Sequence, residues 1–184
     1  MRYCSSRRLV VFALLGSGGT EFGAYGQEIV EPITQELGSM EGWARKTLVI
    51  RPLVAVGPFC LGSKFQPSEF GFVLEKAEKQ NDGVWEDWVS RSPLVTITMV
   101  DGVCISFSTA EARVSLAGKL LLGMKMADLC VLLKNLDIVY GVDDYGSGAA
   151  SVYAENAGIS IFISGGVVVD VHVLAPDETD VVDT

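Results

Sequence analysis

His172 and Asp170 are the residues of this chain whose types and spacing best suit acid–base chemistry. They stand two residues apart in an alternating stretch, so in a strand both side chains would point to the same face. An imidazole beside a carboxylate can accept a proton from a nucleophile or bind a metal ion. However, His172 is the only histidine, and no serine lies in a Gly-x-Ser-x-Gly setting. A solvated strand face explains the pair more simply, so we predict no catalytic residue and no enzyme activity.

Adjacent carboxylates, such as Asp143 and Asp144, could act as general acid and base or as calcium ligands. In a chain this rich in acidic residues, they are most simply solvated loop residues. The four cysteines show no Cys-x-x-Cys or Cys/His spacing of the kind that binds zinc. We therefore predict no metal site and no cofactor.

Two stretches combine aromatic and acidic side chains as protein-binding surfaces do. Trp85 and Trp88 flank two carboxylates in a segment that we expect to be a polar loop. Large aromatics there either pack over the edge of a sheet or anchor a partner. Two aspartates and a tyrosine stand together further along the chain. The candidate partner-binding residues are Trp85, Glu86, Asp87, Trp88, Asp143, Asp144 and Tyr145.

The composition limits the class of partner. The 184 residues include 14 Lys and Arg against 23 Asp and Glu, a net charge of −9, and 49% are hydrophobic, which supports a folded core. Binding to a phosphate backbone requires clustered cations, so nucleic acid is excluded as a partner. The longest apolar run, Leu9–Leu15, is far shorter than the ~18 residues of a membrane-spanning helix. A basic protein is the expected partner, because opposite charge speeds association.

Residues 1–26 have the order of a secretory signal, with three arginines, the apolar run and then a Gly-rich stretch. Small residues precede Gln27, where cleavage would occur. The alternatives are a twin-arginine export signal, an upstream extension or a buried first strand. Cleavage would leave Cys60, Cys104 and Cys130 among apolar neighbours, so we expect buried free thiols and one disulfide at most.

An internal repeat is the strongest pattern in the chain. Gly57–Phe65 aligns with Gly118–Met126, and their Leu-Gly pairs are 61 residues apart. Apolar residues at helical spacing follow each copy, over Phe70–Lys79 in the first and from Met126 in the second. Alternating stretches then predict hairpins, one around Asp101-Gly102 and one 64 residues later.

These elements predict an α+β fold, in which two tandem helix-plus-β-hairpin repeats form one mainly antiparallel sheet with helices on one face. The expected segments are a signal peptide (1–26), an N-terminal helix and linker (27–50, with the helix at Glu28–Leu37), repeat 1 (51–113), repeat 2 (114–175) and an acidic disordered tail (176–184). Alternation in the hairpins places some side chains outward and their neighbours, including Ile105 and Val169, toward the core. The expected outward residues are Thr96, Thr98, Cys104, Ser106, Val168, Asp170 and His172.

The motifs carry a resemblance. Ile50–Leu53, followed by Val56–Phe59 and Leu61-Gly62, resembles the opening of a group of uncharacterised bacterial proteins, whose second half continues like Gly118–Met126 and Asp143–Gly146. The repeat unit is similar to the Leu-Gly-Met helix-and-hairpin module of outer-membrane assembly lipoproteins of the SmpA/OmlA type and of tandem β-lactamase-inhibitory proteins. The resemblance covers about 51–174 and implies a noncatalytic protein-binding module.

We therefore expect an inhibitor or immunity-type protein that neutralises a protein partner, such as a toxin or an enzyme. The alternatives are a periplasmic envelope assembly factor of the SmpA/OmlA kind and a hydrolase that uses Asp/His chemistry. The protein would be periplasmic or secreted if residues 1–26 are a signal, and cytoplasmic otherwise.

Overall fold

The computed structural model describes residues 42–176, and the structural statements below refer to this part of the chain. The predicted signal, the predicted helix Glu28–Leu37 and all but the first residue of the predicted tail lie outside the described residues.

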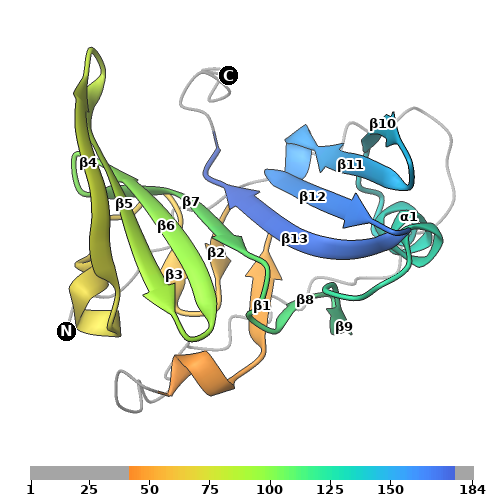
Figure 1. Cartoon of the computed structure of the whole chain (residues 1–184), viewed down its shortest axis with the longest axis horizontal. Helices are drawn as coiled ribbons and strands as arrows, with labels where there is room; N and C mark the ends of the chain where they lie inside the picture. Colours follow the sequence, from red (N-terminus) through yellow and green to blue (C-terminus); the bar gives the residue numbers. More distant parts are fainter. Residues whose placement is uncertain (1–41, 177–184) are drawn as a thin grey trace, which may run out of the picture. The chain divides into compact units, whose positions relative to one another are not determined.

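Strands make up most of the described chain (Figure 1). Short 3-10 helices occupy Trp43–Arg45, Pro67–Phe70 and Glu155–Ala157. The other elements are β1 (Leu48–Arg51), β2 (Ala55–Val56), β3 (Phe59–Cys60), β4 (Val73–Gln80), β5 (Gly83–Arg91), β6 (Leu94–Val100), β7 (Val103–Thr109), β8 (Val114–Leu116), β9 (Lys119–Leu120), α1 (Met126–Asn135), β10 (Gly141–Gly146), β11 (Ala149–Ala154), β12 (Ile159–Ser164) and β13 (Val167–Leu174).

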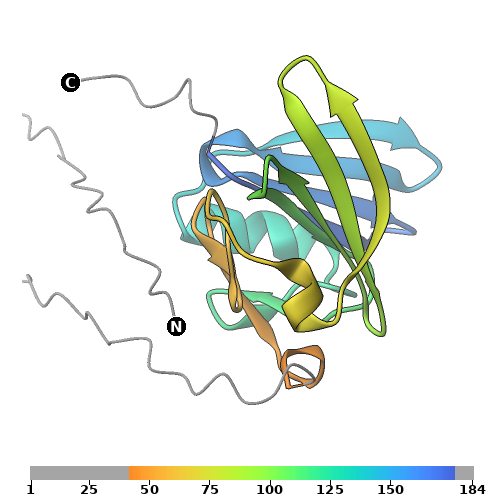
Figure 2. The same cartoon turned by 90° about the vertical axis from the view of Figure 1, so that its left-hand side faces the viewer.

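The predicted α+β class is wrong, because residues 42–176 form a mainly β structure with one α-helix. Five strands form a mixed sheet in the order β3-β2-β1-β8-β9, in which β1 and β8 are parallel. The other eight form an antiparallel sheet in the order β10-β11-β12-β13-β7-β6-β5-β4. Figure 2 shows that α1 and the short strands lie on one side of the eight-stranded sheet.

The helix predicted over Phe70–Lys79 is instead a 3-10 turn followed by strand β4. The prediction came from the apolar residues of this stretch, Phe70, Phe72, Val73, Leu74 and Ala77, which fit one side of a helix. Pairing with β5 along the whole of β4 supplies backbone hydrogen bonds that override this local preference. Charged side chains also suit β4 as an edge strand, because they discourage pairing with other chains.

The unit that recurs is a four-stranded meander and not the predicted helix plus hairpin. Strands β4–β7 form one meander and β10–β13 the other, and β7 pairs with β13 to join them into one sheet. Registers in the two halves correspond: Ile97 pairs with Phe107, and Ile161, 64 residues later, pairs with Val171. All four of these side chains are buried, so the matching registers place the same face of each half in the core.

A β-bulge at the same place in both hairpins changes which side chains face the core. In the first hairpin the register shifts at Thr98/Met99, and Ile105 is the extra residue. In the second it shifts at Phe162/Ile163, and Val169 is the extra residue. Simple alternation therefore fails beyond each bulge: Cys104 and Val168, predicted outward, are buried, whereas Val169 is 40% exposed.

Helix α1 packs under the second half of the sheet. Leu129 and Leu133 are fully buried, and Met126 N–H donates to the carbonyl of Gly166 in the β12–β13 turn. The helix ends in a Schellman arrangement, in which Ile138 N–H donates to Leu133 O and Asp137 N–H to Lys134 O. In the first half aromatic residues fill the corresponding space, where Trp43 stacks on Phe72 and donates its indole N–H to Phe70 O at 2.9 Å.

Candidate functional site

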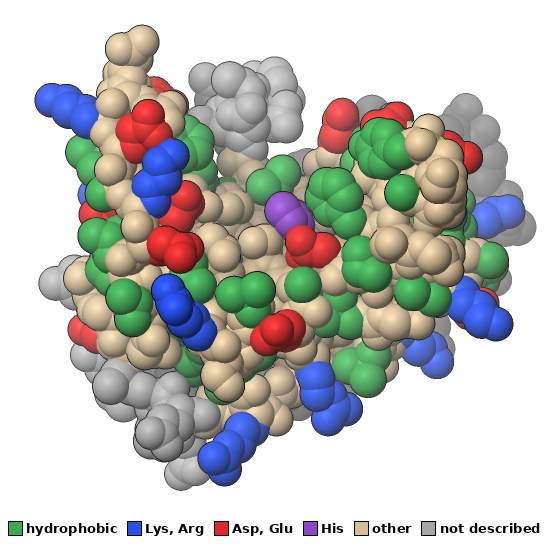
Figure 3. All heavy atoms as spheres, in the orientation of Figure 1, with side chains coloured by type: hydrophobic (Ala, Val, Ile, Leu, Met, Phe, Trp, Pro, Cys, Tyr) green, Lys and Arg blue, Asp and Glu red, His purple; other side chains and the backbone are tan. Residues whose placement is uncertain are grey.

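The face of the eight-stranded sheet away from α1 is the candidate site, and we call it the open face. The register places Tyr153, Ser160, His172, Ser108 and Thr96 in one row across five neighbouring strands. Side chains directly opposite on antiparallel strands are close enough to contact one another. The row has His172 at its middle, where the two halves of the sheet meet (Figure 3).

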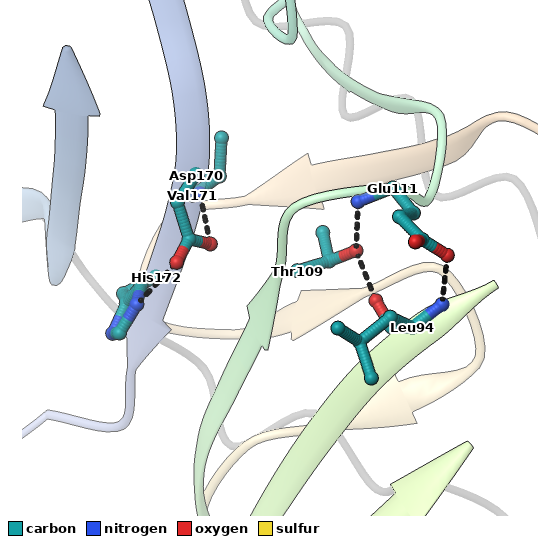
Figure 4. A network of polar contacts seen from close by, with 6 residues as sticks. All are labelled: Leu94, Thr109, Glu111, Asp170, Val171 and His172. Carbon is teal, nitrogen blue, oxygen red and sulfur yellow. Dashed lines mark hydrogen bonds and ion pairs between the residues drawn. The ribbon is translucent and has the colours of Figure 1, made fainter. Parts of the chain in front are cut away.

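His172 and Asp170 form the hydrogen-bonded pair that the sequence suggested. The Nε2 atom of His172 lies 3.2 Å from Oδ2 of Asp170, and the two side chains are 38% and 33% exposed. The other carboxylate oxygen, Oδ1, accepts the Val171 N–H at 2.8 Å, which fixes the carboxylate beside its own strand (Figure 4). The imidazole is thus held in one orientation on the surface of the sheet.

Serines flank this imidazole on both neighbouring strands, since Ser108 of β7 and Ser160 of β12 are each opposite His172. Activation of a serine nucleophile requires a hydrogen bond from its hydroxyl to the imidazole. Within residues 42–176, no hydrogen bond joins a serine hydroxyl to His172. As it stands, the arrangement can bind polar groups of a ligand, but it is not assembled as a nucleophile–base pair.

Aromatic side chains lie on the second half of the open face, on the same side of the sheet as the His172–Asp170 pair. The ring of Phe162 lies 5.5 Å from the imidazole, centroid to centroid, and 40% of Phe162 is exposed. The Tyr145 hydroxyl lies 2.9 Å from the Ser151 hydroxyl, and 63% of Tyr145 is exposed. We call Tyr145, Tyr153 and Phe162, with His172, the aromatic patch. Such residues combine a large apolar area with polar atoms, as contact anchors do.

Gly141 positions one member of this patch. It is the register partner of Tyr153, and a Cβ atom at position 141 would overlap the Tyr153 ring. The absence of a side chain therefore lets the tyrosine ring lie across the edge strand β10.

The structure separates the residues predicted to bind a partner into two groups. Trp85, Glu86, Asp87 and Trp88 belong to β5, whereas Asp143, Asp144 and Tyr145 belong to β10, at the opposite end of the sheet. The predicted polar loop at 85–88 is therefore a strand.

Alternation then divides each group between the two faces. Asp87 accepts a hydrogen bond from Thr98 at 2.9 Å on the open face, and Trp85 shares that side of β5. Trp88 lies opposite the buried Ile97, packs against the core and donates to Glu86 at 3.1 Å. Asp143 is opposite Ser151 on the open face, and Asp144 faces the other way and caps its own turn through Gly146 N–H.

Tyr153 and Phe162 are the surface residues that sequence reasoning missed. Both lie in strands, and alternation alone does not tell which face of a strand is buried. The signal that could have found Phe162 is its place between the apolar neighbours Ile161 and Ile163, both of which are buried.

The Thr109 side chain forms hydrogen bonds with the backbone at the end of β7, where the chain leaves the first half of the sheet. Its hydroxyl donates to Leu94 O at 2.7 Å and accepts the backbone N–H of Glu111 and of Ala112 at 3.2 and 2.8 Å. The Glu111 carboxylate accepts the Leu94 N–H at 2.8 Å and closes the network (Figure 4). Because Thr109 is opposite Val171, this network supports the strand pair that carries His172.

The described part of the chain contains no group of three His, Cys, Asp or Glu side chains able to hold a metal ion. It also contains no helix long and apolar enough to cross a membrane. A comparison with family models, with curated proteins and with solved structures finds no match to this chain.

Proposed function

We propose that this chain is a noncatalytic protein-binding module, of the inhibitor or immunity type, that holds its protein partner on the open face. The observation that carries the proposal is the aromatic patch beside the His172–Asp170 pair. Tyr145, Phe162 and Tyr153 are 63%, 40% and 36% exposed. The Tyr145 hydroxyl lies 2.9 Å from the Ser151 hydroxyl, and the Tyr153 ring lies against Gly141. Exposed aromatics surrounded by small polar side chains are typical of protein-binding surfaces.

The charges of the open face support a basic partner. Asp87, Asp143 and Asp170 lie on this face. Its cations have acidic partners of their own: Lys76, opposite Asp87, is bound to Glu78 at 2.8 Å, and Arg91, on the same side of β5 as Asp87, lies 3.9 Å from Glu75. The whole chain carries a net charge of −9. An acidic face attracts a basic partner over a distance of about a Debye length, so salt should slow association.

The test is capture of a partner by the immobilised full chain, compared with capture by a variant that carries Tyr145→Ala and Phe162→Ala. Val131→Ala is the matched control, because Val131 is 58% exposed but lies on α1, away from the open face. The proposal expects a protein that binds the unmodified chain and the control and binds the double variant more weakly by about 2 kcal/mol or more. Association should also be slower at high salt.

Two outcomes would overturn the proposal. One is that every captured protein binds the double variant as well as the unmodified chain. The other is a hydrolytic activity of the purified protein that His172→Gln abolishes, which would support the hydrolase alternative. Thermal unfolding of each variant separates a loss of binding from a loss of folding.

A further inference from the structure

An apolar groove lies apart from the open face, between the mixed sheet and the chain that follows α1. Its volume is about 410 Å³, within the range of small-molecule sites. Ile50, Leu116 and Ala117 line it from β1 and from the end of β8, and Leu136 and Ile138 line it from the segment after the helix. The walls present apolar side chains with no carboxylate among them.

The one charged residue lining this groove is Arg51. Within residues 42–176, the Arg51 guanidinium makes no hydrogen bond or ion pair with another side chain. A guanidinium presents paired N–H donors that match the two oxygens of a carboxylate. An apolar groove with a single cation therefore has the charge complementarity of a carboxylate attached to an aliphatic chain.

Strained backbone holds both walls of the groove. Ala117 has φ +48° and Asp137 has φ +55°, in the left-handed region that favours glycine. Ala117 belongs to the β8–β9 turn and lines the groove, and Asp137 takes the position after α1 that glycine usually occupies.

We propose that this groove binds the aliphatic chain of a medium-chain carboxylic acid, with the carboxylate paired to Arg51. The apolar walls would remove the chain from water, and Arg51 would select the carboxylate over neutral and cationic head groups. The site is independent of the proposed protein-binding function, because its residues do not belong to the open face.

The experiment is calorimetric titration of the full chain with hexanoate, octanoate and decanoate below their micelle concentrations. Affinity should rise along the series, by up to about fourfold for each methylene that is fully buried. Decylammonium and methyl decanoate serve as probes with the same apolar length but without the carboxylate, and both should bind at least about tenfold more weakly.

Variants locate the binding. Arg51→Gln should weaken decanoate binding about tenfold, whereas Arg91→Gln, a control at an arginine whose side chain is 86% exposed, should leave it unchanged. Leu136→Glu and Leu136→Lys both replace an apolar side chain by a charged one at a residue that is 36% exposed, so both should fold. The glutamate should repel the carboxylate and weaken binding more than the lysine does.

The proposal is overturned if decanoate shows no saturable binding, if decylammonium binds as tightly as decanoate, or if Arg51→Gln and Arg91→Gln behave alike. It is also overturned if sedimentation shows that Leu136→Glu separates a dimer of this chain while leaving decanoate binding unchanged. In that case the groove would be an interface between two copies.

Discussion

Ser108 and His172 are opposite each other in the β7–β13 register and are 64 residues apart, the same offset that relates the two hairpins. Because Thr109 pairs with Val171 and Phe107 with Val173, exchanging the two halves leaves this register unchanged. The β7–β13 pairing, which we call the joint between the halves, therefore has local twofold symmetry in its register. The side chains break the symmetry, since the position that holds His172 in one half holds a serine in the other. The open face consequently has one distinctive centre and not two.

The Thr109 network predicts a measurable contribution to stability at this joint. Thr109→Val keeps the shape of the side chain but removes the hydroxyl that serves Leu94 O and two backbone N–H groups. Thr109 is 3% exposed, so water cannot replace these bonds, and we expect a loss of about 1–3 kcal/mol in the free energy of unfolding. Denaturant titration measures it.

Thr96→Val is the control for this substitution, because Thr96 lies on the open face and its hydroxyl makes no hydrogen bond within the described residues. It should change the free energy of unfolding by less than about 0.5 kcal/mol. Equal effects of the two substitutions would show that the hydroxyl network does not stabilise the joint.

Cys104 predicts a pH dependence of stability on the alkaline side. Burial, with a smaller contribution from the neighbouring Cys60, raises the pKa of the Cys104 thiol from 9.0 to about 12. The folded protein therefore keeps this proton where the unfolded chain loses it. The resulting stability is fully present below pH 9 and is lost as the pH rises toward 12. Denaturant titrations at several pH values between 8 and 11 should show a steeper decline for the unmodified protein than for Cys104→Ala.

A control for this comparison is Val152→Ala, which shortens a buried side chain that does not titrate. It should lower stability at every pH and keep the slope of the unmodified protein. Parallel curves for all three proteins would mean that the Cys104 thiol is not protected from ionisation by folding.

Local patterns predicted the hairpins around Asp101-Gly102 and Gly166, as well as helix α1, because turn glycines and helical spacing are local signals. They failed at β4, where the apolar residues fit helical spacing but pairing with β5 makes a strand. The residues of β4 alone do not distinguish a helix from a strand, because the hydrogen bonds that decide between them are made with β5.

The candidate site was predicted only in part for a similar reason. The pairing of His172 with Asp170 follows from a spacing of two, which a strand preserves. The bulges at Ile105 and Val169 interrupt the alternation of faces closer to each turn, so the faces of Cys104 and Val168 were assigned wrongly. A bulge depends on the partner strand as well as on its own residues.

Helix α1 is expected to depend on its buried side for stability. Leu133→Ala removes a fully buried side chain that faces the sheet, and such a cavity costs about 2–5 kcal/mol. Val131→Ala changes the solvent side of the same helix, where 58% of the residue is exposed, and should cost far less. Denaturant titration of both variants tests this, and similar losses would mean that α1 is not anchored to the sheet through Leu133.

The contact between Gly141 and Tyr153 predicts that substitutions at these two positions are coupled in their effect on the free energy of unfolding. A Cβ atom at 141 would overlap the Tyr153 ring, so Gly141→Ala must displace that ring or move β10. We expect Gly141→Ala to lower the free energy of unfolding by about 1–3 kcal/mol, as overpacking does. When Tyr153→Ala has already removed the ring, the same glycine substitution should cost little.

A double-mutant cycle measures this coupling, which should reach about 0.5–3 kcal/mol if the two residues are in contact. Val142→Ala, next to Gly141 but 40% exposed and paired with Val152, is the control and should show no coupling to Tyr153. Additive effects of Gly141→Ala and Tyr153→Ala would contradict the arrangement. Weaker partner binding by Gly141→Ala, with Val142→Ala unaffected, would place the displaced ring in the interface.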